Sequence, residues 1–245
     1  EVLEHVNPHL ENLSNGYTAS LLAYVLAPLI YSHTPSASAA ALGAVADKSD
    51  VPEIDQLVES SGETRDFFEK LALYVDYEIY LTRTNTSFSV LREFILGSFA
   101  RKRELMNLYE ESFKKQEEEV FTSIKTYAKK ESYGSFDVCL LDGERTTFRG
   151  GYYSIGKLAG MTHQSVHDND ASNAVTIVYS DSILVFRVTQ DNDVFDVNAL
   201  ISHLQSMFPA ARISGGGHAV AGSIKLLPVA FDGVFAEIRK YISNL

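Results

Sequence analysis

The chain has 245 residues, of which 45% are hydrophobic, and it carries 21 basic against 32 acidic side chains, for a formal net charge of −11. That length fits one large domain or two ordinary ones, and the acidic balance excludes a protein that holds nucleic acid through its overall charge. The single cysteine, Cys139, excludes an intramolecular disulfide framework and a zinc site built from several cysteines. Any contact with nucleic acid must therefore come from a local cationic site.

Two features bear on where the protein works. No apolar run reaches the roughly 20 residues that a membrane-spanning helix needs, so we expect no membrane contact. No signal peptide precedes Glu1, and Cys139 lies in an apolar run, where it is expected to be an inert core residue. These features favour a cytoplasmic protein. Because the chain begins with Glu rather than Met, we also expect that something is missing in front of it.

The front of the chain is predicted to be mostly helical. Residues 1–8 (EVLEHVNP) indicate a short strand that ends at its proline, which lacks the donor that a strand ladder requires. Helices are expected, in chain order, over residues 17–31, 36–45, 52–60 and 64–81. Pro28 should kink or end the first of them, and Pro35 should lie in the first turn of the second.

The pattern remains helical from residue 89 to about residue 130, with charges of both signs interspersed, which is typical of a solvated connector helix. Beyond Gly134 the hydrophobic pattern changes to that of strands. Strands are expected over residues 136–142, 174–180, 183–189 and 221–227, and helices over residues 151–161, 196–208 and 232–245. The last two helices have Asp196 and Asp232 as candidate N-caps. The alternation predicts a compact α/β domain.

Residues 212–222, RISGGGHAVAG, combine features of a phosphate site. Glycine loses more backbone freedom on folding than any other residue, so three in a row require a reason. In a glycine-rich turn their N–H groups can form an anion-binding nest, to which His218 adds a hydrogen bond and Arg212 a charged fork. Arg187, whose strand neighbours point to the opposite face, is a further cation. The other interpretation is a tight turn between a helix and a strand, with His218 as a local cap.

The GGGH sequence of residues 215–218, followed by Ala-Gly at the start of a strand, resembles the motif of the DHH-associated domain, the substrate-binding half of DHH-family phosphoesterases. HVNPHLENLSNGYTASLLAYVLA, near the front, is similar to the segment after the Asp-His-His motif of RecJ-like members. LGAVADKSD is similar to their next motif, in which Asp47 matches a metal-binding aspartate. The resemblance covers essentially the whole chain and points most strongly to archaeal RecJ-like proteins.

The resemblance implies an α/β fold in three parts: residues 1–88 as the C-terminal part of a DHH domain, residues 89–130 as a helical connector, and residues 131–245 as the DHH-associated domain. It also implies a site for a substrate phosphate, lined by Gly215, Gly216, Gly217 and His218, with Arg187 and Arg212 as further candidates. Nothing in the sequence fixes the direction of Arg212.

Active members of the family hold two manganese ions in a cluster of aspartates and histidines, and a dinuclear centre needs many oxygen or imidazole ligands. The chain contains no Asp-His-His, and no Asp-x-Asp near its start. Asp47 alone cannot build such a centre, so it would hold metal only if the missing half were supplied, and we expect no manganese to be bound by this chain alone. Other residues with ligand atoms are interpreted as ordinary polar residues: His5, His9, Asp50, His163, His167, Asp168 and Asp170.

Two interpretations of function follow. In the first, the chain is a RecJ-like protein that grips the phosphates of single-stranded DNA or RNA and is non-catalytic by itself, like those relatives that serve as replicative-helicase subunits with GINS- and MCM-type partners. In the second, it is the C-terminal portion of an active manganese-dependent exonuclease, or of a phosphodiesterase for oligonucleotides or cyclic dinucleotides. We favour the first narrowly. Tyr152 and Tyr153 either stack on bases or belong to the core.

Overall fold

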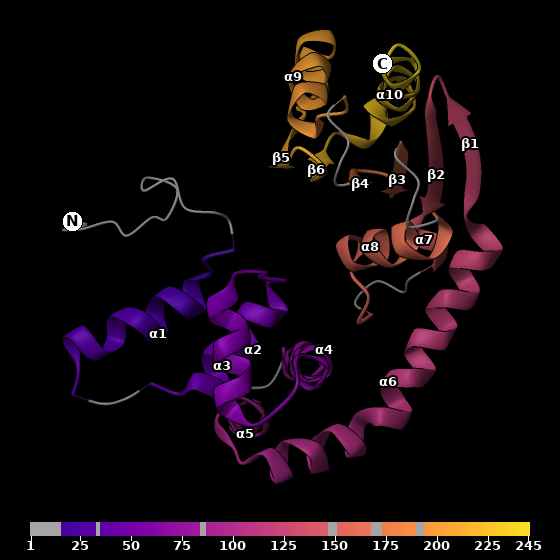
Figure 1. Ribbon diagram of the computed structural model, residues 1–245. Coiled ribbons are helices and arrows are strands. Elements are labelled where there is room, and N and C mark those ends of the chain that lie inside the picture. The colour runs from indigo at the N-terminus through magenta and orange to yellow at the C-terminus, as the bar shows by residue number, and fades with distance from the viewer. Residues whose placement is uncertain (1–15, 33–34, 84–86, 147–150, 168–172, 190–193) are drawn as a thin grey trace. The chain divides into compact units, whose positions relative to one another are not determined.

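The computed structural model describes residues 16–32, 35–83, 87–146, 151–167, 173–189 and 194–245. The chain divides into two compact units, residues 1–114 and 115–245. The first unit is helical, and the second contains a mixed six-stranded sheet with helices against it (Figure 1). The predicted α/β fold with a helical part is thereby confirmed. The three-part division of the chain stays a prediction, and the expected strand over residues 1–8 lies outside the described residues.

The first unit is built from short helices whose starts are set by side-chain caps. Its elements are α1 (Ala19–Ile30), α2 (Ala37–Ala46), α3 (Pro52–Ser61), α4 (Arg65–Thr82), α5 (Ser89–Leu96) and the first part of α6 (Phe99–Tyr127). The hydroxyls of Thr18, Ser36 and Thr64 each accept a first-turn N–H group. Because Ser36 is the cap of α2, Pro35 precedes the helix. The prediction that Pro35 lies in the first turn of this helix is therefore wrong. Helix α1 continues two residues beyond Pro28.

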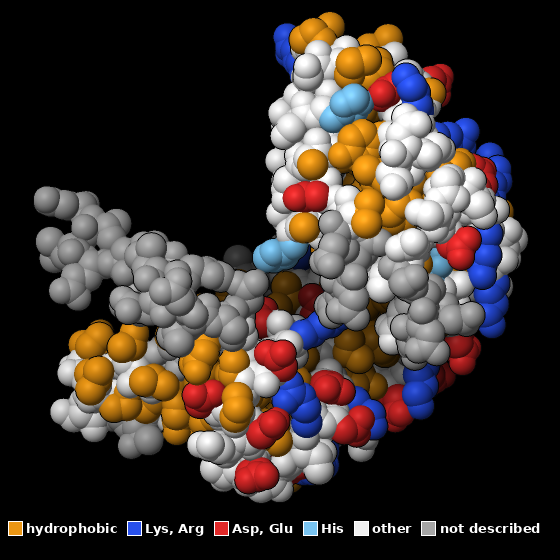
Figure 2. All heavy atoms as spheres, turned by 45° about the horizontal axis from the view of Figure 1, so that its top comes forward, with side chains coloured by type: hydrophobic (Ala, Val, Ile, Leu, Met, Phe, Trp, Pro, Cys, Tyr) orange, Lys and Arg blue, Asp and Glu red, His pale blue; other side chains and the backbone are white. Residues whose placement is uncertain are grey.

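Helix α1 exposes an unusual amount of apolar surface. Val25, Leu29, Ile30 and Tyr31 are 56%, 79%, 71% and 67% exposed, and Leu21 is the helix's one fully buried residue. Figure 2 shows hydrophobic side chains gathered over this helix. A helix that is apolar on nearly all sides is typical of a buried position, and α1 departs from this pattern by leaving these side chains exposed.

The predicted connector over residues 89–130 proves to be more than one element. Helix α5 ends where the N–H group of Gly97 donates to the carbonyl of Glu93, and α6 begins at Phe99 with Ser98 accepting the N–H group of Arg101. Helix α6 ends at Tyr127, and Lys130, which was expected to be helical, belongs to a strand. None of the described helices is both long enough and apolar enough to cross a membrane.

The sheet of the second unit has the order β1-β2-β3-β4-β6-β5. Its strands are β1 (Lys129–Tyr133), β2 (Phe136–Asp142), β3 (Ala174–Tyr179), β4 (Ile183–Val188), β5 (Ser214–His218) and β6 (Ala221–Lys225). Strands β2 and β3 are parallel, and every other neighbouring pair is antiparallel. The sequence predicted β2, β3, β4 and β6 but neither β1 nor β5. The expected glycine-rich turn over residues 215–218 is wrong, because these residues form the edge strand β5.

The sheet's two faces carry different helices. Helices α9 (Val197–Met207) and α10 (Phe231–Ser243) contribute Leu200, Leu204 and Ile238 to a core that also contains Phe186 of β4. Helix α8 (Ile155–Val166) packs against β2, β3 and β4, and the short α7 (Gly143–Thr146) precedes it. The sequence predicted these helices, apart from α7, and Cys139 is fully buried as expected.

The helix starts of the second unit test the predicted caps. The carboxylate of Asp196 accepts the N–H groups of Asn198 and Ala199, so this predicted N-cap is confirmed. Asp232 is not a cap, because α10 already begins at Phe231. Helix α8 begins later than predicted, since its cap is Ser154.

Candidate functional site

The strand register aligns one residue from each strand in a row across the sheet. Successive cross-strand partners in this row are Lys130, Cys139, Thr176, Arg187, Ala221 and His218. Directly opposite residues point to the same face of a sheet, so Arg187 and His218 share a face. They are two strand spacings apart, about 10 Å. The sequence predicted both residues separately, and the register brings them together.

The shared face is covered at one end and open at the other. Helix α8 covers β2, β3 and β4 on this side, and its carbonyl at Gly156 accepts a hydrogen bond from Arg187. Beyond Arg187, the β5–β6 part of the face presents His218, which is exposed, and the half-buried residues Ala221 and Ser223. The surface between Arg187 and the sheet edge is therefore accessible and lined by small residues. We call this part of the sheet the open face.

Arg187 is held in place by backbone carbonyls. Its Nη1 donates to the carbonyl of Phe186 at 2.8 Å and its Nη2 to that of Gly156 at 3.3 Å. Burial lowers the pKa of the guanidinium, but arginine stays charged in proteins. Among the described residues no carboxylate pairs with it, and two of its five N–H donors meet these carbonyls. The guanidinium of Arg187 is thus a cation in a fixed position, and its other N–H groups can donate hydrogen bonds to an anionic ligand.

Two histidines lie on the covered side of Arg187. The hydroxyl oxygen of Thr176 lies 3.0 Å from His163 Nδ1 and 3.2 Å from His167 Nε2. The sequence had not indicated this contact between the two histidines and Thr176. Burial, and then the nearby His167 and Arg187, lower the pKa of His163 to about 4, so this imidazole is neutral at neutral pH. No group of three possible metal ligands occurs among the described residues. The other candidates, Asp168 and Asp170, lie outside those residues, as do His5 and His9.

The neutral state of His163 predicts a pH-dependent stability. Because its folded-state pKa of about 4 lies below the unfolded value of 6.5, the unfolded chain takes up a proton first as the pH falls. The stabilisation that the neutral His163 gives to the folded state is complete above about pH 6.5 and is lost as the pH falls towards 4. We expect about 2 to 3 kcal/mol of unfolding free energy to be lost over this range through His163.

Urea titrations of the wild type and of His163→Gln at each pH measure this loss. The glutamine variant has no proton to take up at this position, so the difference in unfolding free energy between the two proteins should shrink as the pH falls. A difference that stays constant between pH 6.5 and pH 4 would contradict the prediction.

The backbone of β5 has its own polar edge. The N–H group of Val188 donates to the carbonyl of Val220 at 2.8 Å, so the backbone of Val220 faces β4. Backbone polar groups alternate in direction along a strand, so those of Gly222 and Ile224 also face β4. Their partners on β5, Gly217 and Gly215, therefore direct their N–H and carbonyl groups away from β6. Helix α9 meets part of this edge, since Asn198 Nδ2 donates to the carbonyl of Gly217 at 3.1 Å. In the described part of the chain, the outward N–H groups of these two glycines have no acceptor on this edge.

The structure gives two of the three glycines a steric reason. A Cβ atom at Gly215 would overlap the carbonyl oxygen of Ser223, and one at Gly217 would overlap the backbone of residues 221 and 222. The φ angles of Gly217 and Gly216 are 152° and 159°. Residues other than glycine rarely adopt such values. A Cβ atom at Gly216 would meet nothing within 4 Å. The glycines thus permit close pairing of β5 and β6, in place of the predicted nest in a turn.

The remaining candidates lie apart from this row. Arg212 is exposed with a left-handed φ of 50°, and none of the described contacts joins it to Arg187 or His218. Asp47 caps the C-terminus of α2 in the other unit and is exposed. Tyr152 and Tyr153 are 5% and 8% exposed with ring centroids 4.7 Å apart, which favours the core interpretation over base stacking.

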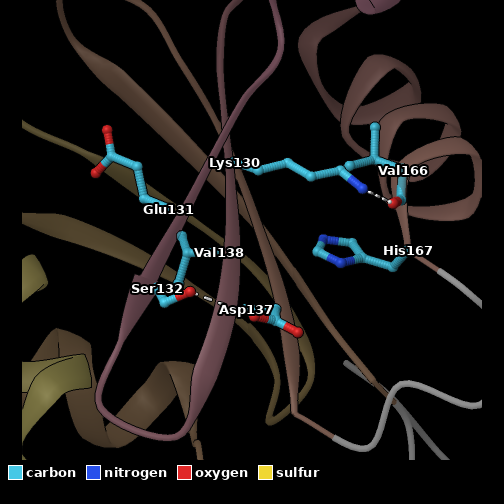
Figure 3. A pocket seen from close by; sticks show the side chains of 7 residues that line it. All are labelled: Lys130, Glu131, Ser132, Asp137, Val138, Val166 and His167. Atoms are coloured by element: carbon cyan, nitrogen blue, oxygen red, sulfur yellow. Dashed lines mark hydrogen bonds between the residues drawn. The ribbon is translucent and has the colours of Figure 1, made fainter.

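The opposite end of the row borders a hollow of about 350 Å³ between the β1–β2 hairpin and the end of α8 (Figure 3). Lys130 Nζ reaches across to the carbonyl of Val166, to which it donates at 2.8 Å, and His167 projects towards the same strands. Asp137 and Glu131 also line the hollow. Its mixed charge, and the use of Lys130 to bond the end of α8, make it a poorer phosphate site than the open face.

The chain is similar in sequence to one curated protein and in fold to several solved structures. No family model matches the chain. An uncharacterized protein of Methanocaldococcus jannaschii is 26% identical over 267 residues, which cover 98% of this chain and 35% of that protein. A solved DHH domain from a member of the s1p family of ribosomal proteins is 26% identical with a TM-score of 0.85, covering 98% of this chain and 58% of that one. Manganese-bound RecJ from Thermus thermophilus, 15% identical over 93% of this chain and 36% of its own, has a TM-score of 0.54 and shows the fold alone.

These likenesses support a relationship of the chain to the DHH/RecJ-like superfamily, which confirms the resemblance read from its motifs. The chain spans about a third of the M. jannaschii protein and 58% of the solved DHH chain. RecJ from Thermus thermophilus has been solved with Mg2+ and with Mn2+. The residues that the structure describes do not fit a centre for these metals, because Asp47 is not joined by two further ligands.

Proposed function

We propose that this chain binds the phosphates of single-stranded DNA or RNA on its open face and is non-catalytic by itself. One observation carries the proposal: Arg187 and His218 lie in the same cross-strand row and border an accessible surface of small residues. The relationship of the chain to RecJ-like proteins, which are associated with nucleic acids, supports the same conclusion.

The chemistry of the open face suits a phosphodiester. Arginine offers a planar fork that matches phosphate oxygens, and its position is already fixed by the carbonyls of residues 156 and 186. His218 can donate a further hydrogen bond, and the outward N–H groups of β5 add neutral donors at the sheet edge. With a net charge of −11 for the whole chain, binding is confined to this local site, and each phosphate contact with a cation is expected to contribute about 0.7 to the salt slope.

The absence of catalysis is proposed from the metal ligands. Hydrolysis of a phosphodiester by a pair of metal ions requires several carboxylates or imidazoles around them. In the described residues Asp47 has no such companions, so the chain alone would bind without cutting. The GINS- and MCM-type partners expected from the sequence stay a prediction.

A second function is favoured by two observations. The chain spans only part of its relatives, and α1 exposes an apolar surface. Both would follow if these residues were the C-terminal portion of a manganese-dependent exonuclease or oligonucleotide phosphodiesterase. The rest of that longer protein would then supply the ligands that complete a centre with Asp47.

Replacing His218 with alanine tests the proposed binding. We expect the affinity for a labelled single-stranded oligonucleotide to fall about fivefold, the value of one net hydrogen bond of about 1 kcal/mol. The melting temperature should not change, because His218 is exposed at the sheet edge. Fluorescence anisotropy measures the affinity, and His218→Gln, which keeps a donor, should recover most of it.

A hydrolysis assay with manganese runs beside this titration. Binding without cleavage, weakened by His218→Ala, is the expected result. Cleavage that is lost in the same variant would reject the non-catalytic proposal and favour the second function. An unchanged affinity with a lowered melting temperature would show that His218 has a structural role instead.

A further inference from the structure

We infer that the phosphate site continues along β6 to Lys225, and that its ligand is an oligonucleotide with at least three successive phosphates. This inference rests on the proposed function and adds a residue and a minimum ligand length to it. Lys225 was not among the residues predicted from the sequence, because nothing in the sequence links it to Arg187.

The register places Lys225 on the open face. Ile183, Lys225 and Ser214 are cross-strand partners in a row parallel to the one that contains Arg187. Side chains alternate along a strand, so Lys225 points to the same side as Ala221, the residue opposite Arg187. Lys225 is exposed, and it pairs with no carboxylate among the described residues. The open face therefore has a cation at each end.

The surface between the two cations has little side-chain bulk. Gly216 and Ser223 form the intervening pair of the register, and a side chain at Gly216 would have met open space. A ligand can therefore lie close to the backbone here. The hydroxyl groups of Ser214 and Ser223 provide donors for phosphate or sugar oxygens.

The spacing of the cations sets the ligand length. Ala221 and Lys225 are four positions apart on one strand, which places the two ends of the site about 13 Å apart. One nucleotide step contains as many backbone bonds as two amino-acid residues and spans at most about 7 Å. A strand held by Arg187 therefore needs two nucleotide steps to bring a phosphate to Lys225. Three successive phosphates are the shortest ligand that engages both ends.

The charge variant Lys225→Gln tests this arrangement with two ligands of different length. The probes are 5′-phosphorylated thymidine dinucleotide, which has two phosphates, and the corresponding tetranucleotide, which has four. We expect the variant to bind the tetranucleotide about fivefold more weakly, with a salt slope reduced by about 0.7, the contribution of one phosphate contact in a single strand. Its affinity for the dinucleotide should equal that of the wild type.

Lys240→Gln is the matched control, because Lys240 is an exposed lysine of α10 in the same unit. It should alter neither affinity. The inferred extension is overturned if Lys225→Gln behaves like this control with the tetranucleotide, or if it weakens the dinucleotide as much as the tetranucleotide. Failure of the wild type to bind either probe would overturn the proposed function itself, which separates the two conclusions.

Discussion

Replacement of Arg187 with glutamine is expected to weaken oligonucleotide binding by about tenfold to about 150-fold and to reduce the salt slope by about 0.7. Charge-assisted hydrogen bonds contribute about 1.5 to 3 kcal/mol, and removal of one phosphate contact lowers the salt slope of single-strand binding by that amount. The effect should exceed that of His218→Ala, because Arg187 is a permanently charged group that is already fixed by two backbone carbonyls. Titrations at several salt concentrations measure both quantities.

Arg187→Lys separates the charge from the geometry of the fork. Lysine keeps the positive charge but cannot form the planar pair of hydrogen bonds, so the salt slope should be retained while the affinity falls. Melting curves serve as the control for folding, since Arg187 also bonds the start of α8 at Gly156. Equal salt slopes for the wild type and Arg187→Gln would remove Arg187 from the binding site.

Local sequence signals predicted most of the elements correctly. The Asp196 cap is an interaction within a few residues, and the apolar runs of β2, β3 and β4 are unmistakable strands that the sheet buries. The predicted starts of two helices were less accurate, because two neighbouring residues could each mark the start. Helix α2 is capped by Ser36, the residue after Pro35, and α10 begins at Phe231, one residue before Asp232.

Strand β5 could not be predicted in this way. Glycine has a low strand propensity, and a run of three is more typical of a turn. What makes residues 214–218 a strand is antiparallel pairing with β6, together with the contacts of α9 from the other side. Strand β1 is likewise polar, with only half-buried and exposed residues, and its pairing with β2 compensates for the missing apolar pattern.

The site itself depends on register, which the sequence does not contain. The motif predicted His218, and the strand pattern predicted that Arg187 points to one face. Only the pairing of β4, β6 and β5 shows that these two residues share a row. The same pairing adds Lys225 to the open face, while on the covered side His163 engages Thr176. Arg212, two positions before β5, gains no such placement.

The prediction with the largest expected effect on stability is Gly217→Ala. Its added methyl group would overlap the carbonyl oxygen of Ala221 and the Cα atom of Gly222, both of which are backbone atoms of the paired strand. Such a clash cannot be relieved by rotating a side chain, so β5 must move away from β6. We expect the unfolding free energy to fall by about 3 kcal/mol or more, from overpacking and an unfavourable φ together. Urea unfolding measures this loss.

Gly216→Ala is the matched control, because Gly216 has nearly the same φ, 159° against 152°, but open space where the methyl group would be. It should lose only about 1 kcal/mol, the part that the backbone conformation contributes. If both variants are equally destabilised, φ and not close pairing explains the glycines. If neither is destabilised, the glycines are not needed for folding, and their presence would be better explained by the approach of a phosphate to the backbone of β5.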